Sequence, residues 1–504
     1  MAPVEWTFAS RLAYWATLRG DDPALIWVPV TGDQRYVTFS QLNHRSTRVA
    51  GALAARGVRA GDTVVVGLPN APEHVVTTLA AWRLGAGVLP LPPNLPARER
   101  QRMLELARPR LAVASWPSPE CPTLAPLELD PSNDSSAPDL ADASPPPFPL
   151  IIGTGGSTGR PKLVRLPIPG RMAPNQGFGV LGQALGISRP LVHLICGPLY
   201  HGNPFAMTQV GLFEGQTVVL LERFSPAGAL AAISEHRVQF ATLVPTMMKR
   251  IAELPDFADA DLDSLQAILH TAAPCPPAVK RVWIDVLGPK RLWEAFGSSE
   301  SVGYIVIRGD DWLAHPGSIG RPLQTDVRIL DATGREVPPG MVGEIYLRLH
   351  GSNGPAYEYV GHSPATQTAD GYVSVGDLGW VDTDGWYYSA DRSQDLIISG
   401  GANIVPAEVE AALLEHPAVA DAAAIGLPDP DWGRRVHALV VPRDSSRAPS
   451  TGELDRHCRQ ALAAYKVPKG YEIVDVLPRT PMGKLNRSEL VQARAIRTPA
   501  GATG

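Results

Sequence analysis

An alternation of short apolar runs with helical patterns, early in the chain, most constrains the fold. Residues 63–68 form an apolar run of strand length, a helical pattern covers about 72–84, and a second strand pattern follows over 87–91. This spacing is typical of βαβ units, which join parallel neighbouring strands. Another helical pattern over 38–56, with Ser40 as its expected N-cap, precedes them. The sequence therefore predicts an α/β fold with a parallel sheet.

Length and composition limit the classes of protein. A chain of 504 residues exceeds a single compact domain. A hydrophobic fraction of 44% and a charged fraction of 19% exclude disorder as the main state. The net charge of −5 argues against a protein that coats nucleic acid or an acidic membrane. Because no apolar run approaches ~18 residues, we expect no membrane insertion and a cytoplasmic location. Four cysteines without close pairs predict free thiols.

Two changes of pattern divide the chain. Residues 117–149 are rich in Pro, Ser and Asp, which predicts a surface loop, and turn signals at 331–334 and 382–385 predict hairpins. Near Arg392 the mixed pattern ends, and we expect a compact α+β unit of about 110 residues beyond it. Its expected elements are a helix over 404–414, strands over 419–427 and 436–441, and a helix over 454–464.

A loop rich in Gly and hydroxyl residues follows the apolar strand at 150–152, and Lys162 closes it. Backbone N–H groups, hydroxyls and one ammonium suit the oxygens of a polyphosphate. The spacing fails both the Walker A pattern and the dinucleotide pattern, because residue 158 is Thr. A second G-x-G-x-x-G match at 177–182 follows no strand and is weak. The loop candidates are Thr154, Gly155, Gly156, Ser157, Thr158, Gly159 and Lys162.

The hydrolase pattern G-x-S-x-G also matches this loop, with Ser157 as the nucleophile. That reading requires a helix directly after the turn. The following residues, 161–169, are strand-like and contain three prolines, so no helix is expected there. A phosphate loop is therefore favoured over a nucleophile elbow and over a plain flexible loop.

Three single residues could each have a chemical role, but none of them indicates that role on its own. Glu300 follows a Gly turn, and its carboxylate is a hard ligand suited to Mg²⁺, although a lone glutamate is more often solvated. Asp377 can accept two hydroxyl hydrogen bonds, as a ribose diol requires. Lys484 stands on a Gly-containing loop, where a surface lysine is the simpler alternative.

Six motifs in this order resemble the adenylate-forming, or AMP-binding, superfamily, which contains acyl-CoA synthetases, peptide-synthetase adenylation domains and luciferases. The motifs are the loop 153–162, the segments 270–274 and 293–300, the Gly-Asp-Leu at 376–378, the segment 390–401 and the Lys loop 478–487. The resemblance spans about residues 10–490. It implies a large N-terminal domain of mixed sheets and helices over 1–391, a hinge at 392–395, a mobile α+β lid over 396–495 and a tail at 496–504.

The resemblance also assigns roles to residues. It implies that Lys484, Glu300 and Ser299 are catalytic, with Glu300 holding Mg²⁺. It implies contacts with ATP and CoA for the loop residues above and for Ala273, Pro274, Phe296, Gly297, Ser298, Asp377, Arg392, Gly400 and Gly401. The family usually has Gly where Thr271 or Ala272 stands, and commonly Asp or Lys where Gln394 stands.

The chemistry that the resemblance implies is activation of a carboxylic acid by ATP to an acyl-adenylate, followed by transfer to the thiol of CoA. Amino-acid-activating relatives carry an Asp in the acyl pocket, and residues 197–205 contain no acid. The chain is therefore more similar to CoA ligases for bulky aryl or alkyl acids, including bile-acid ligases. His201, Val244 and Thr246 are the expected substrate contacts.

Alternatives stay open at this point. The acceptor could be an external carrier protein, or the enzyme could activate nitrite and pass it to an amine, as in diazo formation. A nucleotide binder without turnover is disfavoured because Lys484 and Glu300 are both present. The oligomeric state, monomer or homodimer, stays undecided.

Overall fold

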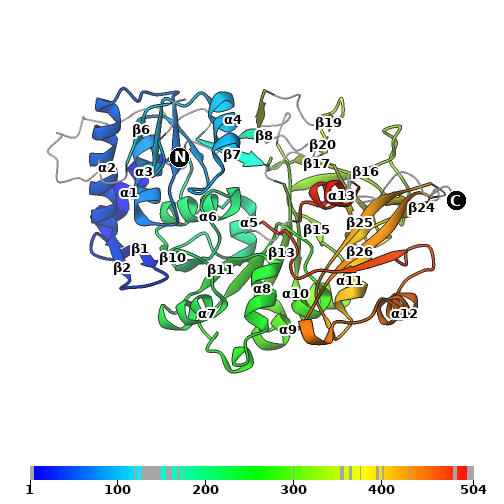
Figure 1. Cartoon of the computed structure of the whole chain (residues 1–504). Coiled ribbons are helices and arrows are strands. Elements are labelled where there is room, and N and C mark those ends of the chain that lie inside the picture. The colour runs from blue at the N-terminus through cyan, green and yellow to red at the C-terminus, as the bar shows by residue number, and fades with distance from the viewer. Residues whose placement is uncertain are drawn as a thin grey trace.

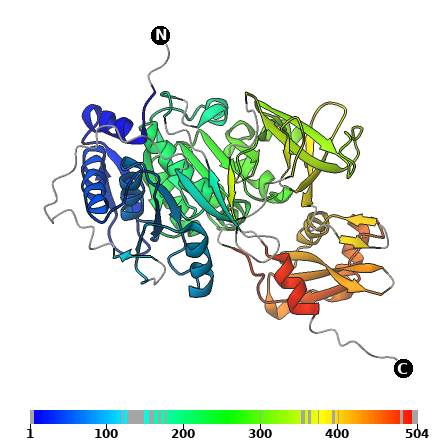
Figure 2. The same cartoon turned by 90° about the horizontal axis from the view of Figure 1, so that it is seen from above.

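The structure, a computed structural model, consists of a large sheet-rich part and a smaller C-terminal part that stands beside it (Figures 1 and 2). This arrangement confirms the predicted mixed α/β fold class. The described residues are 5–117, 121–125, 149–154, 162–166, 171–175, 178–298, 300–351, 357–361, 366–374, 376–392, 397–399, 402–430, 432–480 and 485–495.

The largest sheet within the described residues has nine strands in the order β15-β14-β13-β12-β11-β9-β10-β1-β2. The six strands from β13 to β1 are parallel to their neighbours, and β2, β14 and β15 run antiparallel. Its strands are β1 (Pro23–Val28), β2 (Arg35–Thr38), β9 (Val192–Ile195), β10 (Thr217–Leu221), β11 (Phe240–Leu243), β12 (Ala267–His270), β13 (Leu292–Phe296), β14 (Ile305–Arg308) and β15 (Arg321–Pro322).

Helices connect these strands and cover the sheet, so its central strands are buried and read as continuous apolar runs. Figure 1 shows α7 to α10 below the sheet and α6 above it. The helices are α5 (Gly179–Leu185), α6 (Gly202–Phe213), α7 (Pro226–Glu235), α8 (Pro245–Ala252), α9 (Pro277–Leu287) and α10 (Gly309–Ala314), with short 3₁₀ turns η2 (Phe257–Asp259) and η3 (Pro289–Arg291).

A second sheet of the described chain has seven strands in the order β18-β8-β7-β4-β3-β5-β6. Strands β3 and β4 are parallel and joined by α3, which confirms the predicted βαβ unit. The bounds are β3 (Thr63–Gly67), α3 (Pro72–Arg83), β4 (Gly87–Pro90), α4 (Ala97–Ala107), β5 (Leu111–Ala114), β6 (Thr123–Leu124), β7 (Leu150–Thr154), β8 (Lys162–Leu166) and β18 (Glu358–Val360).

Helices α1 (Phe8–Leu18) and α2 (Phe39–Ala55) pack with α3 at the N-terminal end of the molecule. The cap of α2 is Thr38, and the expected N-cap, Ser40, was wrong. Thr38 accepts from the backbone N–H of Gln41, whose side chain accepts in return from the N–H of Thr38, so a capping box starts the helix two residues earlier.

The third sheet, with six strands among the described residues, follows the order β19-β20-β17-β21-β22, and β16 pairs with β17. Antiparallel hairpins turn at 382–385 and, through a bridge between Leu330 and Glu336, at 331–334, so both predicted hairpins are confirmed. The strands are β16 (Thr325–Leu330), β17 (Gly343–Leu349), β19 (Thr366–Gln367), β20 (Val373–Ser374), β21 (Asp377–Val381) and β22 (Tyr387–Arg392).

The elements after β22 form the smaller C-terminal part. Its helices and strands are β23 (Ile397–Ser399), β24 (Ala402–Ile404), α11 (Pro406–Leu414), β25 (Val419–Asp429), β26 (Gly433–Pro442), η4 (Ser445–Arg447), α12 (Thr451–Ala461), β27 (Gly470–Ile473) and α13 (Arg487–Ala495). The expected helix start at 404 was wrong, because Ile404 ends β24 and Pro406 opens α11. The expected start at 454 was wrong as well, since Ser450 and Glu453 form a capping box.

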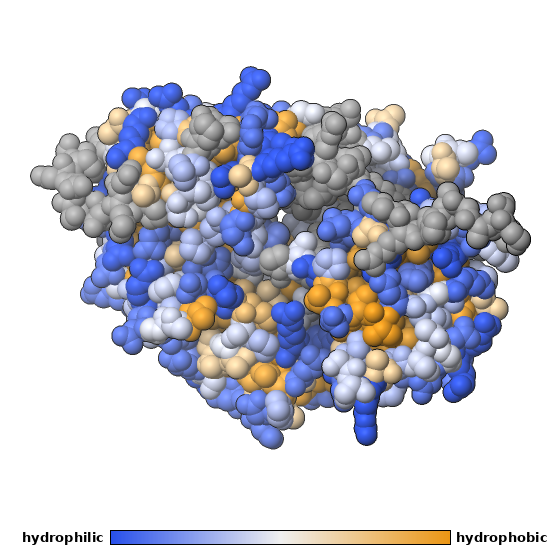
Figure 3. Space-filling view, in the orientation of Figure 1, coloured by the Kyte–Doolittle hydropathy of each residue, from blue (hydrophilic) through white to orange (hydrophobic). Residues whose placement is uncertain are grey.

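All four cysteines are free thiols, as predicted. Burial raises the pKa of Cys196 to about 12, so this thiol stays protonated and is a poor nucleophile. In the part of the chain that the structure describes, no helix has the length and apolar character to cross a bilayer. Hydrophilic residues cover much of the face in Figure 3, and apolar residues gather where α10 and α11 lie in Figure 1.

Candidate functional site

The predicted phosphate loop joins two antiparallel strands. Thr154, at the end of β7, is the register partner of Lys162, at the start of β8, so the hairpin brings both ends of the loop together. The predicted strand after the loop is confirmed. Because a nucleophile elbow needs a helix at this point, the structure excludes the hydrolase reading. Residues 155–161 and the side chains of Thr154 and Lys162 lie outside the described part of the chain.

Glu300 lies beside the base of this hairpin. The hydroxyl of Tyr359 donates to Glu300 Oε1 at 2.7 Å, and Tyr359 stands on β18 as the register partner of Val164 in β8. Two regions about 140 residues apart in sequence, the metal candidate and the phosphate loop, are thereby linked through one tyrosine. Sequence reasoning missed Tyr359, because no motif surrounds it.

The segment between β13 and Glu300 fits magnesium–ATP. The hydroxyl of Ser298 is buried and has no hydrogen-bond partner among the described residues, so an oxygen of a bound phosphate could satisfy it. A Cβ on Gly297 would lie 3.3 Å from the carbonyl oxygen of Gly303, which makes this turn tight. The described residues hold no group of three or more His, Cys, Asp or Glu side chains that could ligate a metal ion. Glu300 is a carboxylate at this turn that could share a Mg²⁺ ion with nucleotide oxygens.

The expected adenine segment continues β12, the strand next to β13. Thr271 Oγ1 donates to the carbonyl oxygen of Ala295 at 2.8 Å and ties the two strand ends together. Ala272 has φ +78°, a left-handed conformation that favours glycine. The family's preference for Gly here thus has a backbone cause, and Ala272 is strained. Ala273 and Pro274 follow and lead into α9.

A buried charged cluster lies behind this segment. Lys280 of α9 forms an ion pair with Glu294 of β13, and its ammonium lies 4.7 Å from the ring centroid of Trp312. His270, the register partner of Glu294, has its Nε2 3.9 Å from Glu294 Oε2. Burial works against the charge on Glu294, but the ammonium of Lys280 holds its pKa below the ordinary value. Burial lowers the pKa of His270 to about 4, so its ring is neutral.

The two ribose candidates are brought together by a hairpin. Asp377 begins β21 and Arg392 ends β22, and the two are register partners. The side chain of Arg392 lies outside the described part of the chain.

A small cavity, about 10 Å³ in volume, lies at the carboxyl ends of β9 and β11, where α6 and α8 begin. Val244 contributes to its wall, whereas Thr246 and His201 stand beside lining residues without lining it. The lining residues are Ile195, Cys196, Gly197, Asn203, Pro204, Thr242, Leu243, Val244 and Met247. Ligands of open α/β sheets bind at this edge.

Asn70 holds one wall of the cavity in place. Its Nδ2 donates to the carbonyl oxygens of Gly197 and Leu221, both at 3.0 Å, and its Oδ1 accepts from Leu199 N at 2.8 Å. A single buried carboxamide therefore fixes the turn after β9. Sequence reasoning missed Asn70, which no periodicity marks.

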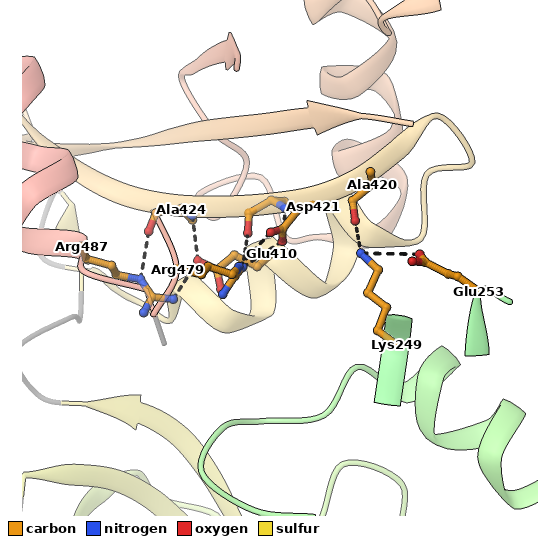
Figure 4. A network of polar contacts seen from close by, with 9 residues as sticks. Lys249, Glu253, Glu410, Ala420, Asp421, Ala424, Arg479 and Arg487 are labelled. Carbon is orange, nitrogen blue, oxygen red and sulfur yellow. Dashed lines mark hydrogen bonds and ion pairs between the residues drawn. The ribbon is translucent and has the colours of Figure 1, made fainter. Parts of the chain in front are cut away.

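Arginine side chains stand on both sides of the loop that contains Lys484, and each is anchored by an ion pair (Figure 4). Arg479 makes a bidentate ion pair with Asp421 of β25, with both N–O distances 2.8 Å. Arg487 donates to Glu410 of α11 at 2.7 Å. Arg479 and Leu485 also form a β-bridge. Residues 481–484 themselves, with Lys484, lie outside the described part of the chain.

Comparisons with known proteins match this arrangement. The AMP-binding enzyme family model matches residues 12–353, and the model of the AMP-binding enzyme C-terminal domain matches residues 408–484. The chain belongs to the AMP-binding enzyme family. It is an AMP-forming carboxylate–CoA ligase. ATP and CoA are its co-substrates, and Mg²⁺ is the cation that it uses.

Among its relatives are two curated ligases and a solved structure. A feruloyl-CoA synthase from Amycolatopsis is 36% identical over 473 residues, 90% of this chain and 93% of that protein. A 2-succinylbenzoate–CoA ligase from Bacillus licheniformis is 33% identical over 92% of this chain and 95% of its own. The O-succinylbenzoate CoA synthetase of Bacillus subtilis, solved with ATP and magnesium, has a TM-score of 0.82 and 30% identity, covering 97% of this chain and 100% of that one.

The predicted site residues of the ligase thus fall into two groups. The first group is described and lies at strand ends and beside the cavity: Glu300, Asp377, Ala273, Pro274, Phe296, Gly297, Ser298, His201, Val244 and Thr246. The other group lies outside the described residues: Gly155, Gly156, Ser157, Thr158, Gly159, Ser299, Gln394, Gly400, Gly401 and Lys484.

Proposed function

We propose that this ligase activates a bulky aryl or alkyl carboxylic acid with ATP and transfers the acyl group to CoA. The observation that carries the substrate class is the cavity at β9 and β11, whose lining has no charged side chain. An amino-acid substrate would bring a buried ammonium group, which needs a carboxylate partner. The names of the relatives, a feruloyl-CoA synthase and 2-succinylbenzoate ligases, support an aryl acid.

In the first step, formation of the acyl-adenylate, each motif binds a different part of ATP. The loop 154–162 holds the β- and γ-phosphates, Glu300 with Ser299 holds Mg²⁺, and the backbone of 272–274 lies against the adenine. Asp377 and Arg392 bind the ribose. The Tyr359–Glu300 hydrogen bond supports this arrangement, because it fixes the cation ligand beside the phosphate hairpin. Charge that develops on the α-phosphate and carboxylate oxygens is stabilised by Lys484.

For the second step, we propose that the small part of the chain rotates. The boundary falls near Arg392, with residues 1–391 as the large domain, 392–395 as the hinge and 396–495 as the lid. Rotation withdraws Lys484 and presents Gly400 and Gly401, whose small size leaves room for the thiol arm of CoA. Gln394 in the hinge slows this step, and Gln394→Asp is expected to speed thioester formation.

The reaction takes place in the cytoplasm, where ATP and CoA are supplied. The four free thiols are in keeping with a reducing compartment.

The test is a mass-spectrometric screen of the purified ligase with ATP, Mg²⁺ and a panel of aryl, alkyl and steroid acids, with and without CoA. We expect an acyl-CoA from at least one aryl or alkyl acid and its loss in Lys484→Ala. The matched control is Lys469→Ala, because Lys469 is an exposed lysine on the same part of the chain.

Other outcomes point elsewhere. Adenylate and pyrophosphate without an acyl-CoA would contradict CoA as acceptor and direct the search to a carrier-protein thiol. Turnover of nitrite with an amine, without any acid, would contradict the acid-activating function altogether.

A further inference from the structure

Two buried polar atoms at the acyl cavity have no partner among the described residues. They are Oγ1 of Thr242, on β11, and Oδ1 of Asn203, in the first turn of α6. Both residues line the cavity. Thr242 is only 8% exposed, so its hydroxyl is shielded from solvent. An unmade hydrogen bond at such a buried group is unfavourable, so a polar partner from the ligand is favoured.

The helices beside the cavity add a second, independent feature. Both α6, with 12 residues, and α8, with 8, begin at its wall, and neither has a side-chain cap at its N-terminus. The N-terminal end of a helix carries a partial positive charge and N–H groups without helical partners. An oxygen atom of a ligand is therefore favoured at this end of the cavity.

The side chains that line the cavity limit which polar group of a ligand can bind there. A carboxylate brings a full negative charge, but no lysine or arginine lines the cavity to balance it. An ammonium group would likewise lack an acidic partner. A carbonyl or ether oxygen cannot donate to Asn203 Oδ1. A hydroxyl both donates and accepts, and it is neutral, so it satisfies the two side chains without an uncompensated charge.

We propose that the acyl cavity of this ligase recognises a hydroxyl group at the distal end of its acid, with Thr242 and Asn203 as the specificity-determining residues. This inference rests on the proposed function, because it takes the cavity to be the acyl site. The volume of about 10 Å³ is room for one water-sized group, far below the ~300–1,000 Å³ of pockets that hold a whole drug-sized ligand. The cavity therefore accepts a single hydroxyl at the end of the acid that lies away from its carboxylate, and not a ring or an alkyl chain.

The test measures ATP-dependent pyrophosphate release, which requires no CoA, with pairs of acids that differ by one hydroxyl. The pairs are cinnamate and para-hydroxycinnamate, phenylpropanoate and para-hydroxyphenylpropanoate, and a medium-chain alkyl acid and its ω-hydroxy counterpart. We expect kcat/KM for the hydroxylated member of at least one pair to be about 10–100-fold higher, because the site's polar groups are left unpaired by the analogue.

Two variants locate the effect. Thr242→Val keeps the shape of the side chain and removes its hydroxyl, and we expect the preference to fall about tenfold. Asn203→Leu is expected to act in the same direction. The matched control is Thr208→Val, another buried hydroxyl on α6, which donates to the carbonyl oxygen of Pro204 and does not line the cavity. This control is expected to keep the preference.

The outcomes separate this inference from the proposed function. Equal rates within every pair, or a preference that survives in both variants, would overturn the hydroxyl site, since a resident water then satisfies the two atoms. Acyl-CoA formed equally from both members would leave the ligase function standing. A hydroxyl preference in pyrophosphate release without acyl-CoA would uphold this inference and remove CoA as acceptor. No release with any of these acids would contradict both.

Discussion

Replacing Lys280 by methionine tests whether the buried cluster behind the adenine segment holds that segment in place. Lys280 is 3% exposed, and the side chain of its partner Glu294 is 11% exposed. Removing one member of a buried ion pair leaves an uncompensated charge and costs about 3–5 kcal/mol. We therefore expect Lys280→Met to lower the free energy of unfolding of the large domain by about 4 kcal/mol.

A double-mutant cycle separates the charge from the packing. Glu294→Gln alone leaves the ammonium unpaired and is expected to cost about as much as Lys280→Met, whereas the double variant removes both charges and is expected to be more stable than either single variant. Urea unfolding followed by tryptophan fluorescence measures these differences. Lys290→Met, at an exposed lysine, is the matched control.

The pH dependence provides a second signature. In the native chain the pKa of Glu294 is below its ordinary value, so its contribution to stability is present above that value and is lost as the pH falls. Without Lys280, burial raises the pKa of Glu294, and stability is then lost as the pH rises. A double variant as unstable as the sum of the singles, or an unchanged direction of the pH slope in Lys280→Met, would refute this reasoning.

Three further predictions concern other parts of the molecule. Burial lowers the pKa of His74 and His193 to about 3 and that of His270 to about 4, from 6.5. At a pH between 4 and 6.5 the unfolded chain therefore binds up to three more protons than the folded chain. Unfolding free energy measured in urea should therefore fall by about 4 kcal/mol for each unit by which the pH is lowered near pH 5. A His74→Leu variant should lose a third of that slope, while exposed His44→Gln keeps it. Ala272→Gly should raise the free energy of unfolding by about 1 kcal/mol, because glycine relieves the left-handed strain, and a loss of stability would contradict it. Tyr359→Phe should raise KM for magnesium–ATP about tenfold through loss of a hydrogen bond to a charged group, with the far-ultraviolet spectrum unchanged; an unaltered KM would remove the tyrosine from the site.

Local pattern predicted the elements whose cause is local. The βαβ unit at 63–91 and the hairpin turn at 382–385 follow from periodicity and turn residues, and the structure confirms both. Where prediction failed, a competing local signal was stronger: Thr38 and Gln41 form a capping box that displaces Ser40. Two of the segments that the motifs mark, 270–274 and 293–300, lie at the ends of β12 and β13.

Contacts between distant segments could not be predicted in this way. Tyr359 reaches Glu300 because β18 pairs with β8, strands about 190 residues apart in the chain. The roles of Asn70 and Thr242 depend on what stands opposite them in three dimensions, and one sequence carries no record of that. The sequence therefore indicated residues whose type has a known chemistry, such as Glu300. It did not indicate residues such as Tyr359 and Asn70, whose roles depend on contacts in three dimensions.

The strengths of the contacts around the lid differ in a way that suits the proposed rotation. Between the two parts of the chain, Lys249 donates to the carbonyl oxygen of Ala420, and Arg443 lies 3.5 Å from Glu253 (Figure 4 shows the first). The Arg443–Glu253 pair is about half exposed, and such pairs contribute about 0–1 kcal/mol. Within the lid, the Arg487–Glu410 pair is only 16% and 14% exposed.

Burial of the second pair makes its loss costly, since either charge alone would be left in a poorly solvated place. The Arg487–Glu410 pair is therefore costlier to break than the exposed Arg443–Glu253 pair. The proposed rotation would break the Arg443–Glu253 pair at little cost, whereas Arg479 and Arg487 would keep their partners Asp421 and Glu410, because all four residues belong to the C-terminal part.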